Sequence, residues 1–269
     1  MPEQKLHIVT RTDVGRKRSN NEDCLGSEPA LGMVVLADGM GGARGGEFAS
    51  ALAVDTVLSD LRDKLPALGD GGATAELQPG PRARLARVAI QQANRRIHEA
   101  ATRQPQYRGM GTTVVVALFE PERVSIAHVG DSRLYRYRDG RLHQLTHDHT
   151  LVQEYVDRGI DRATALEQAN GNLVTRALGV EATVEVDVQE RPTQPDEVYL
   201  LCSDGLTDLV DDGEIAALLG AYVDDLDAAA GALIDTANER GGKDNVSVIL
   251  VRVPGAQQGR GWLRRMLRG

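Results

Sequence analysis

The chain has 269 residues, of which 41% are apolar and 26% charged, which suits a folded domain with a substantial core. Its formal net charge of −8 argues against a nucleic-acid-binding protein, because such proteins normally carry a basic field. No apolar run is long enough to cross a membrane, and the N-terminus lacks the pattern of a signal peptide. We therefore expect a cytoplasmic protein without a transmembrane segment.

The N-terminal part of the chain predicts two strands and two helices. Residues 6–12 and 33–37 have strand patterns, and residues 46–61 place their apolar side chains on one side of a helix. Residues 64–81 are rich in Pro and Gly and predict a loop. Pro81 suits the first turn of the next helix, in which apolar residues recur every four positions.

The middle of the chain predicts an antiparallel meander. Residues 112–119, 123–129, 133–138 and 141–145 are short β-branched runs separated by turn residues, and Asp139-Gly140 is a strong hairpin signal. Tight turns of this kind join antiparallel neighbours rather than parallel strands.

The remaining chain adds helices, strands and a basic tail. The predicted elements are a polar helical segment at 149–178, strands at 184–188, 197–203 and 245–253, and helices at 212–219 and 226–240. Together these patterns indicate an α+β domain in which helices cover antiparallel sheets. No linker divides residues 1–254. Residues 255–269 hold four arginines, no acid and the only Trp, and are expected to be either an unstructured end or a segment that docks on an acidic partner or anionic membrane.

Acidic residues stand at the ends of several predicted strands. The apolar run 34–37 ends at Asp38, and five glycines follow within eight residues. A turn alone would explain this junction, but so would a metal ion or phosphate that must approach the backbone closely. The pattern recurs at Asp131, at Asp204 with Asp208, and at Asp244.

If these carboxylates meet, cations must compensate their charge, because like charges raise one another's pKa. Oxygen ligands without His or Cys select hard ions such as Mg²⁺ or Mn²⁺. Two such ions can activate a water and bind a phosphoryl group. The spacing of a calcium-binding EF-hand is absent, and neither Cys24 nor Cys202 is followed by the arginine of a cysteine-phosphatase loop.

Six motifs, in this order, resemble the signatures of the metal-dependent PP2C (PPM) Ser/Thr protein phosphatases, bacterial branch: RTDVGRKRSNNEDC, LADGMGGARGGEFAS, GMGTTVVVAL, AHVGDSRLYRYRDGRLHQLTHDH, LCSDGLTDLV and GGKDNVSVILV. The resemblance spans residues 6–253. It implies a four-layer αββα sandwich, with two antiparallel sheets between helical layers, metals at one end, and a flap at about 149–179. We expect this flap to influence substrate choice.

The resemblance also implies roles for individual residues. Asp38 would bridge two core ions, Mn²⁺ or Mg²⁺, with Gly39 giving a backbone carbonyl and Glu22 acting on one metal through water. Asp204 and Asp244 would complete the shell of the other metal.

Three further roles follow from the same motifs. Arg18 would pair with the substrate phosphate, since its planar fork suits oxygen recognition. Asp131 and Asp208, with Asp204, match the positions that hold a weaker third metal in bacterial members.

The implied reaction is direct hydrolysis of phospho-Ser or phospho-Thr by activated water, without a phosphoenzyme. Met40 departs from the eukaryotic relatives, which have a His there that is proposed to protonate the leaving group. The implied partners are phosphoproteins and a cognate Ser/Thr kinase, and a monomer is expected. Two alternatives stay open: a pseudophosphatase that binds phosphoproteins without turnover, and a phosphatase dedicated to one anti-sigma antagonist.

Several polar residues near these motifs are expected to have lesser roles. His147 and His149 are expected to border the substrate cleft rather than to bind metal. Thr112 and Thr113 are expected to be buried strand residues near the metal site, and Arg44 a solvated arginine.

Overall fold

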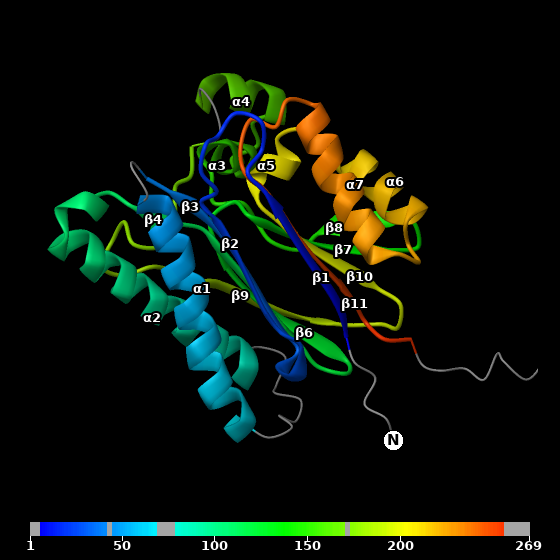
Figure 1. Cartoon of the computed structure of the whole chain (residues 1–269), viewed down its shortest axis with the longest axis horizontal. Helices are drawn as coiled ribbons and strands as arrows, with labels where there is room; N and C mark the ends of the chain where they lie inside the picture. The colour runs from blue at the N-terminus through cyan, green and yellow to red at the C-terminus, as the bar shows by residue number, and fades with distance from the viewer. Residues whose placement is uncertain (1–5, 42–44, 69–78, 170–172, 256–269) are drawn as a thin grey trace, which may run out of the picture.

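Two antiparallel β-sheets lie face to face at the centre of the molecule, and helices cover the outer face of each (Figure 1). This arrangement confirms the expected four-layer αββα sandwich. The structure is a computed structural model that describes residues 6–41, 45–68, 79–169 and 173–255.

The first sheet has five strands in the order β1-β11-β10-β7-β8. These strands are β1 (His7–Asp13), β11 (Val246–Arg252), β10 (Val198–Cys202), β7 (Arg133–Arg138) and β8 (Arg141–Gln144). Helices α6 (Asp212–Ala221) and α7 (Leu226–Glu239) cover its outer face. Each helix is preceded by an N-cap aspartate, Asp211 or Asp225, whose side chain accepts a backbone N–H of the first turn.

The second sheet has the order β2-β3-β5-β6-β9 and is covered by helices α1 and α2. Its strands are β2 (Asp23–Glu28), β3 (Met33–Met40), β5 (Val114–Phe119), β6 (Arg123–Val129) and β9 (Asp187–Pro192), with β4 (Gly111–Thr112) paired to the end of β3. Helix α1 spans Gly45–Lys64, and α2 spans Pro81–Arg103 with the expected proline in its first turn. Short 3-10 turns occur at Pro29–Leu31, Leu65–Leu68 and Pro105–Tyr107.

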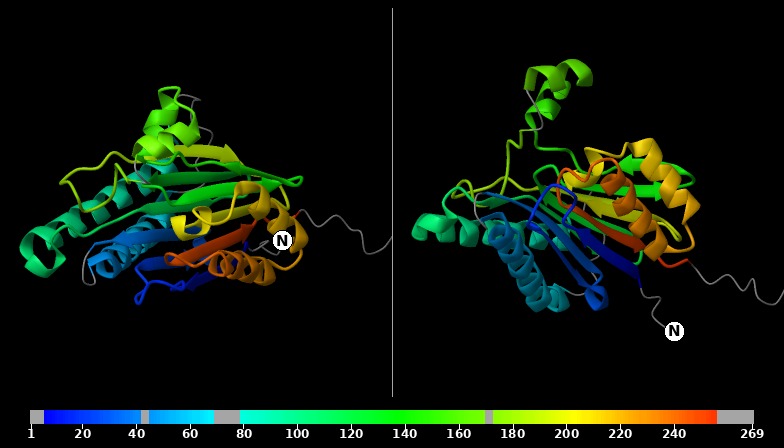
Figure 2. Two further views of the ribbon diagram at one scale, coloured as in Figure 1. Left: turned by 90° about the horizontal axis from the view of Figure 1, so that it is seen from above. Right: turned by 45° about the horizontal axis from the view of Figure 1, so that its top comes forward.

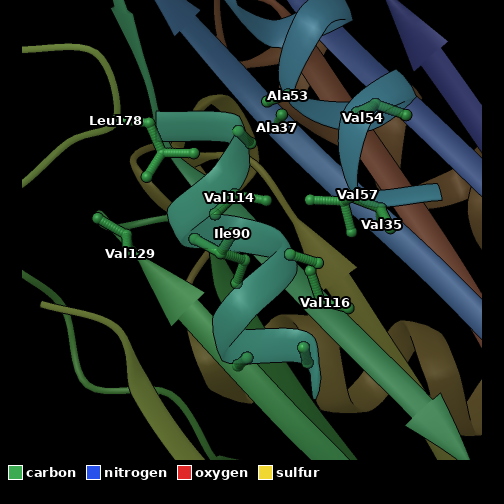
Figure 3. Close-up of a cluster of buried hydrophobic side chains, with 14 of the residues drawn as sticks. Val35, Ala37, Ala53, Val54, Val57, Ile90, Val114, Val116, Val129 and Leu178 are labelled. Atoms are coloured by element: carbon green, nitrogen blue, oxygen red, sulfur yellow. The ribbon is translucent and has the colours of Figure 1, made fainter. Parts of the chain in front are cut away.

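Three apolar layers hold the sandwich together. Alternate side chains of β3 point to opposite faces, so Val34 and Leu36 pack between the sheets while Val35 packs beneath α1 and α2. Figure 3 shows the layer under these helices, where Val35 lies close to Val57. Burial on both faces explains why β3 is continuously apolar.

The expected flap contains two short helices and the segments that flank them. Helices α3 (Leu151–Asp157) and α4 (Arg162–Ala169) stand out from one end of the sandwich (Figure 2). Their own small core contains Val152, Ala165 and Ala169. The flap is thus attached at its two ends rather than packed along a sheet.

The expected meander is wrong. The pairs β5–β6 and β7–β8 form as expected, but β6 and β7 belong to different sheets. The chain crosses between the sheets at Gly130, whose φ of +104° suits a glycine. Local sequence identifies a turn there but carries no information about which sheet the next strand joins.

Other elements also differ from the sequence expectation. The segment 149–178, expected to be helical, contains only the short helices α3 and α4 among its described residues. The strand expected at 184–188 lies at Asp187–Pro192, and neither β2 nor the four-residue helix α5 (Asp204–Thr207) was predicted. The sequence of β2, DCLGSE, has little β-propensity, and its pairing with β3 stabilises the extended backbone. No helix in the described ranges has the length and apolar character needed to cross a bilayer.

Candidate metal and phosphate site

Asp38 lies at the end of β3, where its backbone is held on both sides. Its N–H donates to Thr113 Oγ1 at 3.0 Å, and its carbonyl accepts from Thr112 Oγ1 and from Thr113 N, both at 2.8 Å. Both threonines are buried, as expected. This arrangement fixes the direction in which the Asp38 carboxylate leaves the strand.

Glycines let three segments meet beside Asp38. A Cβ on Gly39 would lie 2.1 Å from the carbonyl oxygen of Gly46, at the start of α1, and 2.7 Å from that of Glu22. A Cβ on Gly46 would lie 2.6 Å from Glu22 Oε2. The glycine-rich junction therefore serves close approach of backbone and carboxylate, which a plain turn would not need.

Two more acids come from α5. Asp204 is its first residue, separated from β10 by Ser203, and Asp208 closes the helix with its N–H donating to Asp204 O at 2.8 Å. Asp131 follows β6 and is buried. Electrostatic coupling of Asp204 to both Asp131 and Asp208 places the three carboxylates in one neighbourhood.

Asp244 and Arg18 approach the same end from the start of β11 and the loop after β1. Arg18 Nη2 donates to Asp244 Oδ2 at 2.7 Å, and both side chains are partly exposed. Asp244 also accepts from the N–H of Asn245 at 2.9 Å. The guanidinium of Arg18 is therefore held at the rim of the carboxylate cluster.

The carboxylates raise one another's pKa. Loss of hydration and the charges of Asp23, Asp204, Asp131 and Asp244 raise the pKa of Asp38 well above its ordinary value. Burial, together with the neighbouring acids, raises the pKa of Asp204 to about 8 and that of Asp131 to about 6. These oxygen donors cannot all be ionised near neutral pH without cations, so the cluster and its glycine cradle fit hard divalent metals.

Two organising residues were missed by the sequence reasoning. Asp23 faces Asp38 across the β2–β3 pair, accepts from Ser203 Oγ at 2.9 Å, and has a pKa raised by burial to about 6. Asn245 accepts from Glu22 N at 2.8 Å and donates to the carbonyls of Val14 and Asn20, both at 2.9 Å. Each directly follows an expected site residue, Glu22 or Asp244, and that adjacency was the available signal.

A second cluster, of His128, His149 and Asp187, has nitrogen and oxygen atoms within 4.8 Å of one another. The guanidinium of Arg176 already occupies it, 2.7 Å from Asp187 Oδ1 and 2.9 Å from His149 Nε2. Burial also lowers the pKa of His149 to about 4, so its ring is neutral. The Arg176 guanidinium thus takes the place that a metal ion would need. We infer that this cluster joins the flap to the sheet.

His149 does not border the cleft, contrary to expectation. It is buried, its ring accepts from Gly130 N at 3.0 Å, and its carbonyl accepts from Thr175 N at 2.8 Å. His147 is exposed and pairs with Asp157 of α3 at 2.8 Å. Arg44 lies outside the described residues.

Comparison with known proteins decides the family. The model of the protein phosphatase 2C family matches residues 15–239. The chain belongs to the PP2C family. It is 40% identical to the Ser/Thr phosphatase Stp of Listeria welshimeri over 259 residues, which cover 95% of this chain and 99% of that protein.

Solved PP2C structures have the same fold. The Mycobacterium tuberculosis Ser/Thr phosphatase PstP matches with a TM-score of 0.81 and 36% identity over 93% of this chain and 99% of that one. A PstP catalytic domain in complex with two manganese ions matches with a TM-score of 0.77 and 35% identity over 92% and 98% of the two chains. This PP2C protein is a metal-dependent protein Ser/Thr phosphatase that uses two Mn²⁺ or Mg²⁺ ions.

Proposed function

We propose that the carboxylate cluster at the flap end of the sandwich is the catalytic centre of this phosphatase. The observation that carries the proposal is that acids from four other segments act on the Asp38 carboxylate, and together with burial they raise its pKa. In this proposal Asp38 would contribute to holding both core ions, Gly39 would offer its carbonyl, and Asp204, Asp244 and Glu22 would complete the ligands. Asp131 and Asp208, with Asp204, would hold a weaker third ion.

The bound ions would supply an activated water and neutralise the charge that develops on the phosphoryl group. The chain's own residues position the reactants. Arg18 exchanges its bond to Asp244 for the substrate phosphate, while Thr112 and Thr113 keep Asp38 in place. Met40 carries no dissociable proton, so the leaving Ser or Thr oxygen must receive its proton from another group.

The substrates are phosphoproteins, and the proposal adds that a cognate Ser/Thr kinase produces them. The relatives named Ser/Thr phosphatases support the phosphoprotein substrates. A monomer in the cytoplasm, with residues 1–254 as one catalytic domain, completes the proposal on the evidence of the sequence. The proposed ligands all come from one chain.

Manganese titration followed by calorimetry tests the ligand roles. Asp38→Asn should lower the affinity for both core ions by at least about tenfold, since a carboxylate ligand is lost from each. Asp131→Asn should lower only the affinity for the third ion. The control is Asp139→Asn in the β7–β8 turn, where the φ of +51° suits Asn. Full manganese binding by Asp38→Asn would refute the assignment.

A further inference from the structure

A partly exposed apolar strip lies beside the proposed centre and takes no part in the mechanism above. It consists of Met40 and Val180, which meet over the buried Gly111. A Cβ placed on Gly111 would lie 3.3 Å from Val180 Cγ2 and 3.5 Å from Met40 Cγ, so both side chains lie close to this glycine. Val180 is 59% exposed, and Met40 is half-buried.

The strip is continuous with the backbone that holds Asp38. Met40 pairs with Gly111, and Gly39 pairs with Thr112, across β3 and β4. Thr112 in turn bridges to Leu178. Three segments therefore run side by side at the end of β3, and Met40 stands two residues after Asp38.

Val180 is held rigidly although it is exposed. The N–H of Gly179 donates to Asn94 Oδ1 at 2.8 Å, and Asn94 Nδ2 donates to the carbonyls of Glu181 at 3.0 Å and Ala182 at 3.3 Å. Asn94 is itself 1% exposed. Leu178, on the other side, belongs to the buried cluster of Figure 3.

An exposed valine on a mobile loop would need no explanation. Here a buried asparagine uses both ends of its side-chain amide to fix the segment that presents Val180. The chain thus keeps an apolar side chain in water, at a defined position, beside a second apolar side chain and the proposed metal ligand Gly39. Such a preorganised surface favours binding of a matching apolar group, because little ordering entropy remains to be lost.

We propose that Met40 and Val180 form a subsite for an apolar side chain of the substrate, on the residue next to the phosphorylated Ser or Thr. The proposal rests on the proposed catalytic centre. A phosphoprotein segment bound there through its phosphate has its neighbouring residue within reach of the strip, since Met40 and Asp38 lie on one strand. Burial of a leucine side chain against Met40 and Val180 should favour such substrates by roughly tenfold in kcat/KM.

The test uses phosphothreonine peptides with Leu or Asn directly before, or directly after, the phosphorylated residue. Leu and Asn have similar sizes and differ mainly in polarity. The wild type with manganese should prefer Leu by roughly tenfold at one of the two positions. Val180→Thr, which keeps the shape of the side chain, should remove most of this preference, and Met40→Gln should weaken it.

Two controls separate the outcomes. Val88→Thr changes an equally simple exposed valine on α2, 46% exposed, and should leave the preference intact. Hydrolysis of p-nitrophenyl phosphate, which has no neighbouring residue, should be unchanged in Val180→Thr.

Equal kcat/KM for the Leu and Asn peptides in the wild type would overturn the subsite and leave the catalytic centre standing. The subsite would also be overturned if Val180→Thr slowed all peptides and p-nitrophenyl phosphate alike. Failure of the wild type to hydrolyse any of these compounds with metal would instead contradict the proposed centre itself.

Discussion

Arg18 places a positive charge at the rim of the carboxylate cluster. Its guanidinium is paired with Asp244, at the point where the phosphate of a substrate would arrive. A charge-assisted hydrogen bond of this kind can be exchanged for a similar one to phosphate at little cost. Because both groups are partly exposed, this ion pair contributes little to the stability of the fold. Its proposed role is to keep the Arg18 guanidinium in position to bind the phosphate.

Arg18→Ala should lower kcat/KM for a phosphopeptide by about 10- to 100-fold, as expected for the loss of a charged hydrogen bond. The kcat/KM of Arg18→Lys should lie between those of the wild type and Arg18→Ala, because lysine keeps the charge but lacks the planar guanidinium. Steady-state kinetics with manganese would measure both. Arg11→Ala, which removes a similarly exposed arginine paired with Asp227, is the control and should have no effect.

Asp204 makes the metal-free protein sensitive to pH. Its pKa is raised to about 8 in the folded chain, against about 3.9 for an unfolded aspartate. Between these two pKa values the folded state binds more protons than the unfolded state does. The free energy of unfolding therefore falls as the pH rises from the lower pKa to the higher one. His128 and His149, whose pKa values are lowered by burial, act in the opposite direction only below about pH 6.5.

We expect the melting temperature of EDTA-treated protein to fall from pH 7 to pH 8.5, where the histidines are neutral in both states. Asp204→Asn should flatten this fall, and saturating manganese should remove it. Thermal denaturation at fixed ionic strength would measure all three. A metal-free melting temperature that stays level or rises over this range would refute the electrostatic account.

At the scale of elements, the site depends on close contacts between backbones. The short helix α5 approaches β11 so closely that a Cβ on Gly205 would lie 2.0 Å from the carbonyl oxygen of Asn245. Asn245 in turn binds the loop that carries Arg18 and Glu22. Gly205 therefore joins the helix of Asp204 to the strand that follows Asp244.

Gly205→Ala should lower the free energy of unfolding by about 1–3 kcal/mol, as overpacking does, and the melting temperature by roughly 2–12 °C. Gly231→Ala is the matched control in α7, where an added Cβ meets no atom within 4 Å. That substitution should stabilise the protein by up to about 1 kcal/mol through helix propensity. Equal melting temperatures for the two variants would contradict the close-contact argument.

The elements also show how far sequence reasoning reached. Long periodic segments such as α1, α2 and α7 were predicted because their apolar residues repeat with the helical period. Strand β2 was missed because its residues are extended only through pairing with β3, which no local pattern records. The crossing at Gly130 was missed for the same reason: the turn is local, but the choice of sheet depends on residues far along the chain.

For the candidate site, the motifs predicted the carboxylates that act on Asp38, with the exception of Asp23. Asp38, Asp131, Asp204 and Asp244 come from separate segments, and they were linked before the structure by their shared position at predicted strand ends and by the family resemblance. Asp23 and Asn245, which help to organise the cluster, were marked in the sequence only by their adjacency to Glu22 and Asp244. Asn245 and Asp23 act through contacts with distant backbone or side chains, which leave no spacing in the sequence.

At the scale of the whole molecule, the proposed centre uses residues between Arg18 and Asp244 only. Removal of residues 255–269, the basic tail, should therefore leave hydrolysis of p-nitrophenyl phosphate within about twofold of the full chain, the spread expected for a change remote from the chemistry. The measurement is kcat and KM for the truncated and full-length proteins. A large loss of kcat would show that the tail packs on the catalytic domain.

The two sheets bring the carboxylates together at the flap end of the sandwich, where we propose that they hold the catalytic metals. Hydrolysis of a phosphothreonine peptide by the purified protein, with Mn²⁺, Mg²⁺ or EDTA, tests this proposal most directly. We predict turnover that requires metal, is lost in Asp204→Asn and persists in Asp139→Asn. Undiminished turnover in EDTA, or in folded Asp204→Asn with manganese, would contradict the central claim that these carboxylates hold the catalytic metals.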